Sequence, residues 1–398
     1  MRLILLLLLI PTAHAQLAVR GDLVYTMEGN PIQNGVVLTS ADGQIEAVGP
    51  AAAIVLPDGY RVLDAAVVTP GFVDARATVG LSGILNQEGD QDHLDTSAPI
   101  QPELRAIDAY DPTEALVDWV LSFGVTTVHA GPSPGAPVAG QTAIFKTAAE
   151  TVAEGLVEEA PMVVFVLGSG IRRNFDTPGT RSKEIAMLRE ALLDAQRYAE
   201  GMADEDEAKR PSRDLRNEAL ARVLSGEVAA LVTAHRAHDI LTALRLADEF
   251  GLRLVLDGGA EAYRVADHLS DRQIPVILHP TMIRPYGDAK NASFETAKTL
   301  RDRGIPVAIQ SGYEAYVPKT RVVLFEAAVA AAHGLGTEGA LETITLAPAR
   351  ILGIDDRVGS LAEGKDADLV LFDGDPFEYT SHVCTVIASG EVVVDECR

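Results

Sequence analysis

The chain has 398 residues, of which 47% are hydrophobic and 5% aromatic, and its formal net charge is −24 at pH 7. This length suits one large α/β domain with a smaller companion rather than several small domains. The 57 acidic residues outnumber the 33 basic ones. Because binding to a phosphate backbone needs a basic face, this composition argues against nucleic acid as a partner.

The first 15 residues have the pattern of a signal peptide. Arg2 precedes an apolar run from Leu3 to Ile10, and Ala13-His14-Ala15 matches the small-residue cleavage pattern. The run is too short to span a membrane, and no cysteine near the cleavage site offers a lipid anchor. We therefore expect an exported protein, periplasmic or secreted, that has no stable membrane anchor. The alternative is that residues 1–15 form a buried first strand.

The two ends of the mature chain look alike. Residues 17–50 contain short apolar runs separated by turns such as Asp42-Gly43, a strong hairpin signal. Residues 368–398 repeat this pattern, and Cys384 and Cys397 flank a strand, a turn and a strand around Gly390. We predict that residues 16–66 and 351–398 pair into a small β-sandwich, since neither end alone buries a second face. In an exported protein, the two cysteines are a candidate disulfide.

Between these ends, residues 67–350 alternate short apolar runs with longer segments of helical spacing. Eight runs have the length of strands: 72–74, 124–129, 142–146, 162–167, 229–233, 253–256, 275–278 and 306–309. This pattern predicts a (β/α)8 TIM-type barrel, whose site lies at the carboxyl ends of the strands. The polar excursion 80–102 follows the first strand, so we expect it near the mouth of the barrel.

Three motifs carry a family resemblance. The segment VVTPGFVDARATVG at 67–80 resembles the opening strand of the amidohydrolase superfamily, where the pattern PG(F/L)(I/V)DxHxH carries two metal ligands. The return motif GSLAEGKDADLV at 359–370 and the segment ITLAPARILG at 344–353 also resemble that superfamily, most closely its imidazolonepropionase-like and dipeptidase-like branch. The resemblance implies a metal-dependent barrel with a flanking β-sandwich that hydrolyses C–N bonds. It also implies a possible homo-oligomer.

The metal ligands of the family are mostly replaced. Arg76 and Thr78 stand where the resemblance places the first two histidines, and Gly258 and Gly312 stand where it places a later histidine and the aspartate. An arginine repels a cation, and glycine has no side chain to bind one or to act as a base. Lys146 is the candidate for the bridging lysine, and His235 matches the histidine after the fifth strand. The usual two-metal site is therefore not expected.

A different set of side chains follows the predicted strands. The residues at these ends are His129, Lys146, His235, Asp257, His279 and Gln310. We hypothesise that His129, His235 and His279 bind one divalent, zinc-like metal ion, because three protein ligands plus water is the catalytic arrangement. A protein without any metal is an equal alternative, in which these histidines are hydrogen-bonded pocket residues. His235, His279 and Lys146 are the candidate catalytic residues.

Cationic and polar residues near the predicted mouth are candidates for binding a small molecule. The proposed substrate-binding residues are Arg76, Arg236, Asp257, Gln310 and Glu314. With Arg284, Lys319 and Arg321, the arginines would form a pocket for a carboxylate or amide, although each can also pair with nearby acids.

The preferred hypothesis is an exported amidohydrolase-like enzyme with a reduced or reorganised metal site, acting on an amide, cyclic amide or dipeptide-like bond. The alternative is an inactive amidohydrolase-fold protein that binds a small ligand.

Overall fold

The computed structural model describes residues 16–85, 87–281, 286–313 and 323–398. The predicted signal peptide, 1–15, lies outside the described residues, as do Arg284, Glu314, Lys319 and Arg321. Among the described helices, none combines the length and the apolar character needed to cross a membrane.

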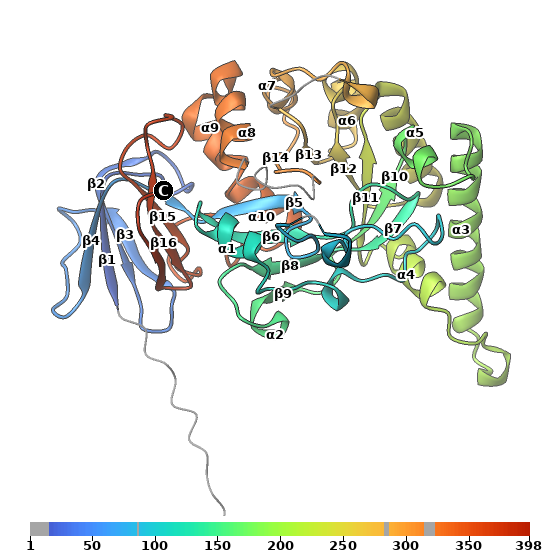
Figure 1. Ribbon diagram of the computed structural model, residues 1–398, viewed down its shortest axis with the longest axis horizontal. Coiled ribbons are helices and arrows are strands. Elements are labelled where there is room, and N and C mark those ends of the chain that lie inside the picture. The colour runs from blue at the N-terminus through green and yellow to red at the C-terminus, as the bar shows by residue number, and fades with distance from the viewer. Residues whose placement is uncertain (1–15, 86, 282–285, 314–322) are drawn as a thin grey trace, which may run out of the picture.

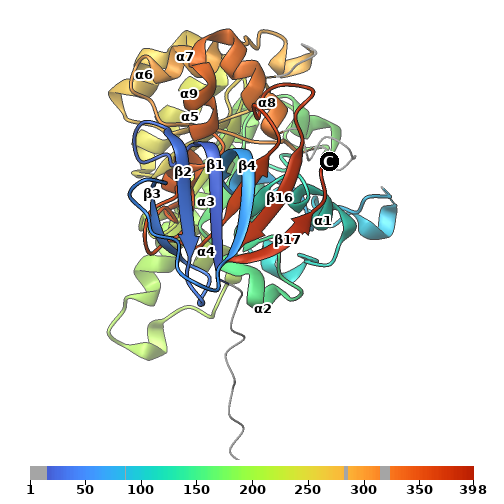
Figure 2. The ribbon, with the colours of Figure 1, turned by 90° about the vertical axis from the view of Figure 1, so that its left-hand side faces the viewer.

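Both ends of the chain contribute to one seven-stranded sheet, in the order β17-β16-β15-β4-β1-β2-β3. Figure 1 shows its blue and red strands side by side, and Figure 2 shows the sheet face on. Its strands are β1 (Leu17–Val24), β2 (Ile32–Thr39), β3 (Ile45–Pro50), β4 (Arg61–Pro70), β15 (Leu369–Phe372), β16 (Val383–Ala388) and β17 (Glu391–Asp395). The described strands of the two ends pair with each other, but they form no second sheet facing this one. The predicted sandwich is therefore not confirmed.

The strand β4 connects this end sheet to the body. It pairs with β1 and with β15, and after Gly71 the chain continues directly into β5 (Phe72–Ala77). A side chain at Gly71 would lie 2.2 Å from the hydroxyl oxygen of Thr126. Only glycine fits this close approach, which explains the Pro-Gly pair of the opening motif.

The body contains two further sheets. The six-stranded sheet has the order β14-β13-β12-β11-β10-β7, and the four-stranded sheet has the order β5-β6-β8-β9. Their strands, besides β5, are β6 (Val125–Ala130), β7 (Val138–Gln141), β8 (Ala143–Lys146), β9 (Leu156–Glu158), β10 (Met162–Val166), β11 (Ala229–Ala234), β12 (Leu254–Gly258), β13 (Val276–Leu278) and β14 (Val307–Ile309).

All eight predicted strands occur in the mixed α/β body, but they do not form the closed ring of parallel strands that we predicted. The strands β10 to β14 are parallel neighbours, as are β5 and β6. The exception is the third strand. Residues 138–146 run antiparallel to both neighbours, with β7 paired to β10 and β8 paired to β6. Within the described part of the chain, the backbone pairing between β5 and the segment that follows β14 is limited to the isolated bridge between Ala77 and Gly312.

Side chains from both body sheets nevertheless share one inner core. Alternate residues of the strands, such as Val73, Ile144, Val164, Leu231 and Ile277, belong to a single buried cluster. The residues between them pack outwards against helices, as expected for strands buried on both faces. The carboxyl ends of the parallel strands therefore surround one mouth, although the hydrogen-bonded ring is open.

Helices cover the outside of the body, with the long α3 at one edge (Figure 1). Their bounds are α1 (Ala115–Leu121), α2 (Val152–Gly155), α3 (Arg181–Met202), α4 (Leu215–Leu224), α5 (Ala237–Phe250), α6 (Ala266–Asp271), α7 (Thr296–Arg301), α8 (Val323–Ala330), α9 (Gly336–Glu342) and α10 (Leu346–Leu352). The Thr180 side chain caps α3, and Gly251 ends α5 in the left-handed conformation.

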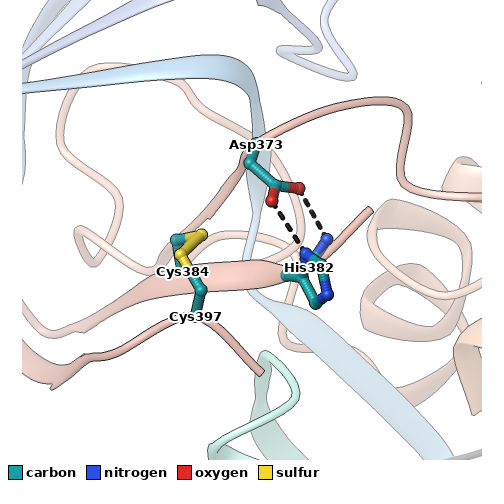
Figure 3. The surroundings of a disulfide bond; sticks show 4 residues. All are labelled: Asp373, His382, Cys384 and Cys397. Atoms are coloured by element: carbon teal, nitrogen blue, oxygen red, sulfur yellow. Dashed lines mark hydrogen bonds and ion pairs between the residues drawn. A yellow bond between two sulfur atoms is a disulfide. The ribbon is translucent and has the colours of Figure 1, made fainter. Parts of the chain in front are cut away.

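The predicted disulfide between Cys384 and Cys397 is confirmed. It lies beside Asp373, whose carboxylate accepts hydrogen bonds from the backbone N–H of His382 at 2.6 Å and from the His382 ring at 2.8 Å (Figure 3). The bridge ties β16 to the end of the chain.

Lys146 lies at the opposite end of the strands from the mouth, so its predicted catalytic role is wrong. Because β8 is antiparallel to β6, Lys146 pairs with Thr127, near the beginning of β6. Its Nζ atom is 2.5 Å from Asp368 and 3.0 Å from Asp366, the two aspartates of the return motif. Lys146 therefore joins the body to the end sheet in a largely buried ion pair.

We predict that Lys146→Met destabilises the fold by about 3–5 kcal/mol, because it leaves the buried carboxylate of Asp368 without its cation. Urea unfolding measures this change. The matched control is Arg20→Met, which removes an exposed ion pair with Asp64 and is expected to change stability little. Equal effects of the two substitutions would contradict a structural role for Lys146.

Candidate functional site

Asp74 marks the point where β5 meets β14. Its carboxylate accepts hydrogen bonds from the Ser311 hydroxyl at 2.5 Å, from the Ser311 N–H at 3.2 Å and from the Arg76 N–H at 3.2 Å. The side chain is fully buried, and burial raises the pKa of Asp74 to about 6, against the opposing effect of these hydrogen bonds. Asp74 thus joins β5 to the segment after β14 through side-chain hydrogen bonds, where the two have little backbone pairing.

Arg76 carries a buried positive charge where the resemblance places a metal ligand. The residue is 0% exposed, and its guanidinium donates hydrogen bonds to the carbonyl oxygens of Ala77, at 3.0 Å, and Pro132. Its Cζ atom lies 5.4 Å from the centre of the Tyr313 ring, within the range of a cation–π contact. Burial lowers the pKa of Arg76, while Tyr313, Asp257 and Asp74 oppose this shift. Among the described residues, the Nε atom has no hydrogen-bond partner.

His129 cannot serve as a ligand without losing existing hydrogen bonds. Its Nδ1 atom lies 2.7 Å from the carbonyl oxygen of Ala75, and its Nε2 atom lies 2.7 Å from the Thr142 hydroxyl. Complete burial, with the nearby charge of Arg76, lowers the pKa of His129 to about 3. The predicted metal role of His129 is therefore corrected to a neutral residue that links β5 to the third strand.

Asp257, at the end of β12, is hydrogen-bonded to side chains from the ends of β11 and β14. It accepts a hydrogen bond of 2.5 Å from the Thr233 hydroxyl on β11 and one of 2.6 Å from Nε2 of Gln310, which follows β14. This donation by Nε2 fixes which side of the Gln310 amide carries the oxygen. The oxygen, Oε1, can accept a hydrogen bond, and it has no partner among the described residues. The structure brings these two predicted residues together.

His235 and His279 follow β11 and β13 and lie near each other. Within the described part of the chain, the Nδ1 atoms of both rings are buried without a hydrogen-bond partner. Burial lowers the pKa of His235, and the neighbouring His279 lowers it further, while Asp257 opposes the shift. The His279 ring also meets Tyr313 edge to face, with 6.1 Å between ring centres. The lowered pKa keeps His235 neutral near pH 7, with its ring beside that of His279.

Arg236 lies near Asp288, whose charge also acts on His235. Its Nε lies 3.6 Å from Asp288, which also accepts hydrogen bonds of 2.7 Å from the backbone and hydroxyl of Ser169.

Burial raises the pKa of the nearby Glu184 to about 7, and one of its oxygens accepts a hydrogen bond from Gly168 N–H at 3.1 Å. Sequence analysis missed Glu184, because an acid in the first turn of a helix normally indicates an exposed residue near a cap. It also missed Ser311, which no motif marks.

The residues at the mouth do not fit the metal site of the family. A side chain at Gly258 would lie 2.7 Å from the His235 ring, so this ring fills the space that a further histidine would need. Among the described residues, the only three potential ligands with atoms within 4.8 Å of one another are Asp373 and the two disulfide cysteines. The predicted centre of His129, His235 and His279 is therefore not assembled. The nearby charge of Arg76 opposes a cation as well.

Comparisons with known proteins identify the family. The solved structure of an amidohydrolase from Thermotoga maritima MSB8 has a TM-score of 0.89 and 31% identity, covering 96% of this chain and 100% of that chain. A model of the amidohydrolase family matches residues 295–394. The chain belongs to the amidohydrolase family.

Two curated relatives are similar over part of their length. The amidohydrolase tasK of Hapsidospora irregularis is 24% identical over 342 residues, which are 78% of this chain and 34% of that protein. The imidazolonepropionase of Thermoplasma volcanium is 29% identical over 116 residues, which are 28% of this chain and 29% of that protein. The matched segments thus span about a third of these relatives.

We predict that Asp74→Asn changes the pH dependence of stability. The folded state binds a proton at Asp74 up to about pH 6, whereas the ordinary pKa is 3.8. The contribution of Asp74 to the unfolding free energy of the native protein therefore falls by about 2.4 kcal/mol as the pH rises from 4 to 7, and the asparagine variant does not share this loss.

Urea unfolding of both proteins at pH 4 and pH 7 tests this prediction. The stability of the variant relative to the native protein should increase by about 2.4 kcal/mol between these pH values. The exposed Asp58→Asn substitution serves as the matched control. A difference that is constant with pH would contradict the account of Asp74.

Proposed function

We propose that this protein is an exported hydrolase that cleaves a C–N bond of a small amide, cyclic amide or dipeptide-like substrate. The mouth lined by the ends of β5, β11, β12, β13 and β14 would be its active site. The proposal assigns no step to a metal ion. It rests on one observation: several buried polar atoms at this mouth have no hydrogen-bond partner among the described residues. Besides the Tyr313 hydroxyl, there are four. They are Arg76 Nε, His235 Nδ1, His279 Nδ1 and Gln310 Oε1.

These four atoms match the polar groups of an amide. An amide carbonyl oxygen accepts a hydrogen bond, which Arg76 Nε–H can donate, and an amide N–H donates one, which Gln310 Oε1 can accept. Unpaired buried groups of this kind cost about 1–3 kcal/mol each, so a polar ligand that pairs them gains affinity and orientation. Asp257 holds the Gln310 amide in the orientation that this pairing needs.

The two imidazoles supply proton transfer. His235, whose pKa is lowered by burial, is neutral at pH 7 and would take the proton of the attacking water. The same proton would then pass to the leaving nitrogen by way of His279, whose ring lies next to His235, so the pair gains no net proton over the reaction. The positive charge of Arg76, with support from Tyr313, would stabilise the negative charge that develops on the carbonyl oxygen.

A second function is favoured by a different observation. Four family positions hold Arg76, Thr78, Gly258 and Gly312, and the His235 ring occupies the space beside Gly258. An inactive protein that uses the same orphaned atoms to bind an amide-bearing small molecule would fit this loss. The two functions share the ligand chemistry and differ in the fate of the ligand.

Export is proposed from the signal-like pattern of residues 1–15 and agrees with a disulfide, which persists in oxidising compartments. The homo-oligomer implied by the resemblance remains a prediction.

The test is amine release from proline-containing dipeptides, N-acetyl amino acids and five- and six-membered cyclic amides, measured by mass spectrometry. We expect His235→Ala and His279→Ala each to lower kcat by about 100-fold or more, since proton transfer contributes about that much. The acid limb of kcat/KM should have an apparent pKa below 6.5, because activity is lost as His235 gains a proton.

The matched control is His333→Ala, an exposed histidine on the helical turn after α8, which should retain full activity. If no compound of the panel is cleaved but one binds in calorimetry, and His235→Ala weakens that binding, the binding function holds instead. Cleavage that survives both mouth substitutions would contradict the assignment of the site.

A further inference from the structure

A cavity of about 400 Å³ lies beneath the polar excursion that follows β5. Residues between 81 and 109 line one side, and Pro132 and Ala139 line the other. Its volume falls within the range of small-molecule sites. The carbonyl of Pro132 also accepts a hydrogen bond from Arg76, so the cavity lies next to the mouth without including the histidine pair.

Backbone hydrogen bonds hold this excursion in place. Gly83 N–H donates to Asp90 at 2.7 Å, and Asp92 N–H donates to Leu81 at 2.9 Å, which forms a short hairpin. Ser133 N–H donates to the carbonyl of His93 at 2.7 Å, which ties the hairpin to the loop after β6. The cavity is therefore a built feature of the fold.

Three side chains of the cavity have buried polar atoms without a partner among the described residues. They are Gln91, through both Nε2 and Oε1, His93, through Nδ1, and Glu103, through Oε2. Buried polar atoms are normally hydrogen-bonded, and four such atoms around one cavity indicate a polar ligand that supplies the partners.

The charges of the cavity select a cation. Four carboxylates line it, those of Asp92, Asp95, Glu103 and Asp108, against the single guanidinium of Arg105. Arg105 is already paired with Asp108, at 2.8 and 2.6 Å, and with Glu159, at 2.8 Å.

The His93 ring and the second oxygen of Glu103 leave this balance negative. Burial lowers the pKa of His93, so this ring adds no charge near pH 7. One oxygen of Glu103 pairs with Arg216 at 2.8 Å, and the other has no partner among the described residues.

The remaining wall is aliphatic and contains Leu81, Leu94 and Leu104. We propose that this cavity is a second binding site, which takes a small aliphatic amine that also carries an amide group. The ammonium would meet the free oxygen of Glu103, the amide would pair with both ends of the Gln91 amide, and the hydrocarbon part would cover the leucines. This site does not depend on hydrolysis at the mouth.

Calorimetry with L-leucinamide on the full mature protein tests the proposal. We expect saturable binding of one molecule per chain. N-acetyl-L-leucinamide, which lacks the charge, and 4-methylpentanoate, which carries the opposite charge, should each bind at least about tenfold more weakly, because a lost charge-assisted hydrogen bond is worth about that factor. Absence of saturable L-leucinamide binding, or equal affinity for the acetylated compound, would overturn the proposal.

Variants locate the bound probe. Gln91→Leu and Glu103→Gln should each weaken L-leucinamide binding by about tenfold or more, whereas Glu363→Gln, an exposed acid of the return motif, should not. Circular dichroism confirms folding, and if Glu103→Gln loses its fold with the Arg216 pair, Gln91→Leu decides the result. Binding that His235→Ala abolishes and Gln91→Leu leaves intact would place the probe at the mouth and refute this site. Hydrolysis of the amide panel by the Gln91→Leu variant is measured separately, because that activity tests the proposed function of the mouth and not this second site.

Discussion

The burial of the Arg76 guanidinium at the end of β5 shapes the whole mouth. A charge removed from water must be compensated by its surroundings, and here the compensation comes from two backbone carbonyls, the face of Tyr313 and the charges of Asp74 and Asp257. These partners come from different strands and loops. The buried charge of Arg76 therefore organises residues that are far apart in the chain.

The same charge explains why the neighbouring polar groups differ from a metal centre. A metal ion would need neutral imidazoles and free carboxylate oxygens directed at one point. Instead, the two carboxylates are already hydrogen-bonded within the protein, Asp74 to Ser311 and Asp257 to Thr233 and Gln310. Both ring nitrogens of His129 are likewise hydrogen-bonded, to Ala75 and Thr142. Of the three histidines proposed as ligands, His235 and His279 keep a ring nitrogen without a hydrogen-bond partner among the described residues. The fold of the family is retained, but the oxygen and nitrogen atoms that could bind a metal are largely hydrogen-bonded within the protein.

Much of the fold could be predicted from the sequence, because apolar runs of strand length are visible as such. The eight body strands, the pairing of both chain ends and the disulfide followed from such patterns. The direction of residues 138–146 could not, since the period of a strand is the same in both directions. That reversal moves Lys146 from the mouth to an ion pair with Asp368. The partners of His129 were also invisible, because a strand-end histidine carries the same signal whether its nitrogens are free or bonded.

Equilibrium dialysis of the purified mature protein against zinc at neutral pH, followed by elemental analysis, tests the central claim most directly. Because Arg76 supplies the positive charge at the mouth, we expect no stoichiometric zinc, and we expect the same after the free ring nitrogens are removed in a protein with both His235→Ala and His279→Ala. One or two zinc ions per native chain, lost in that double variant, would contradict the account.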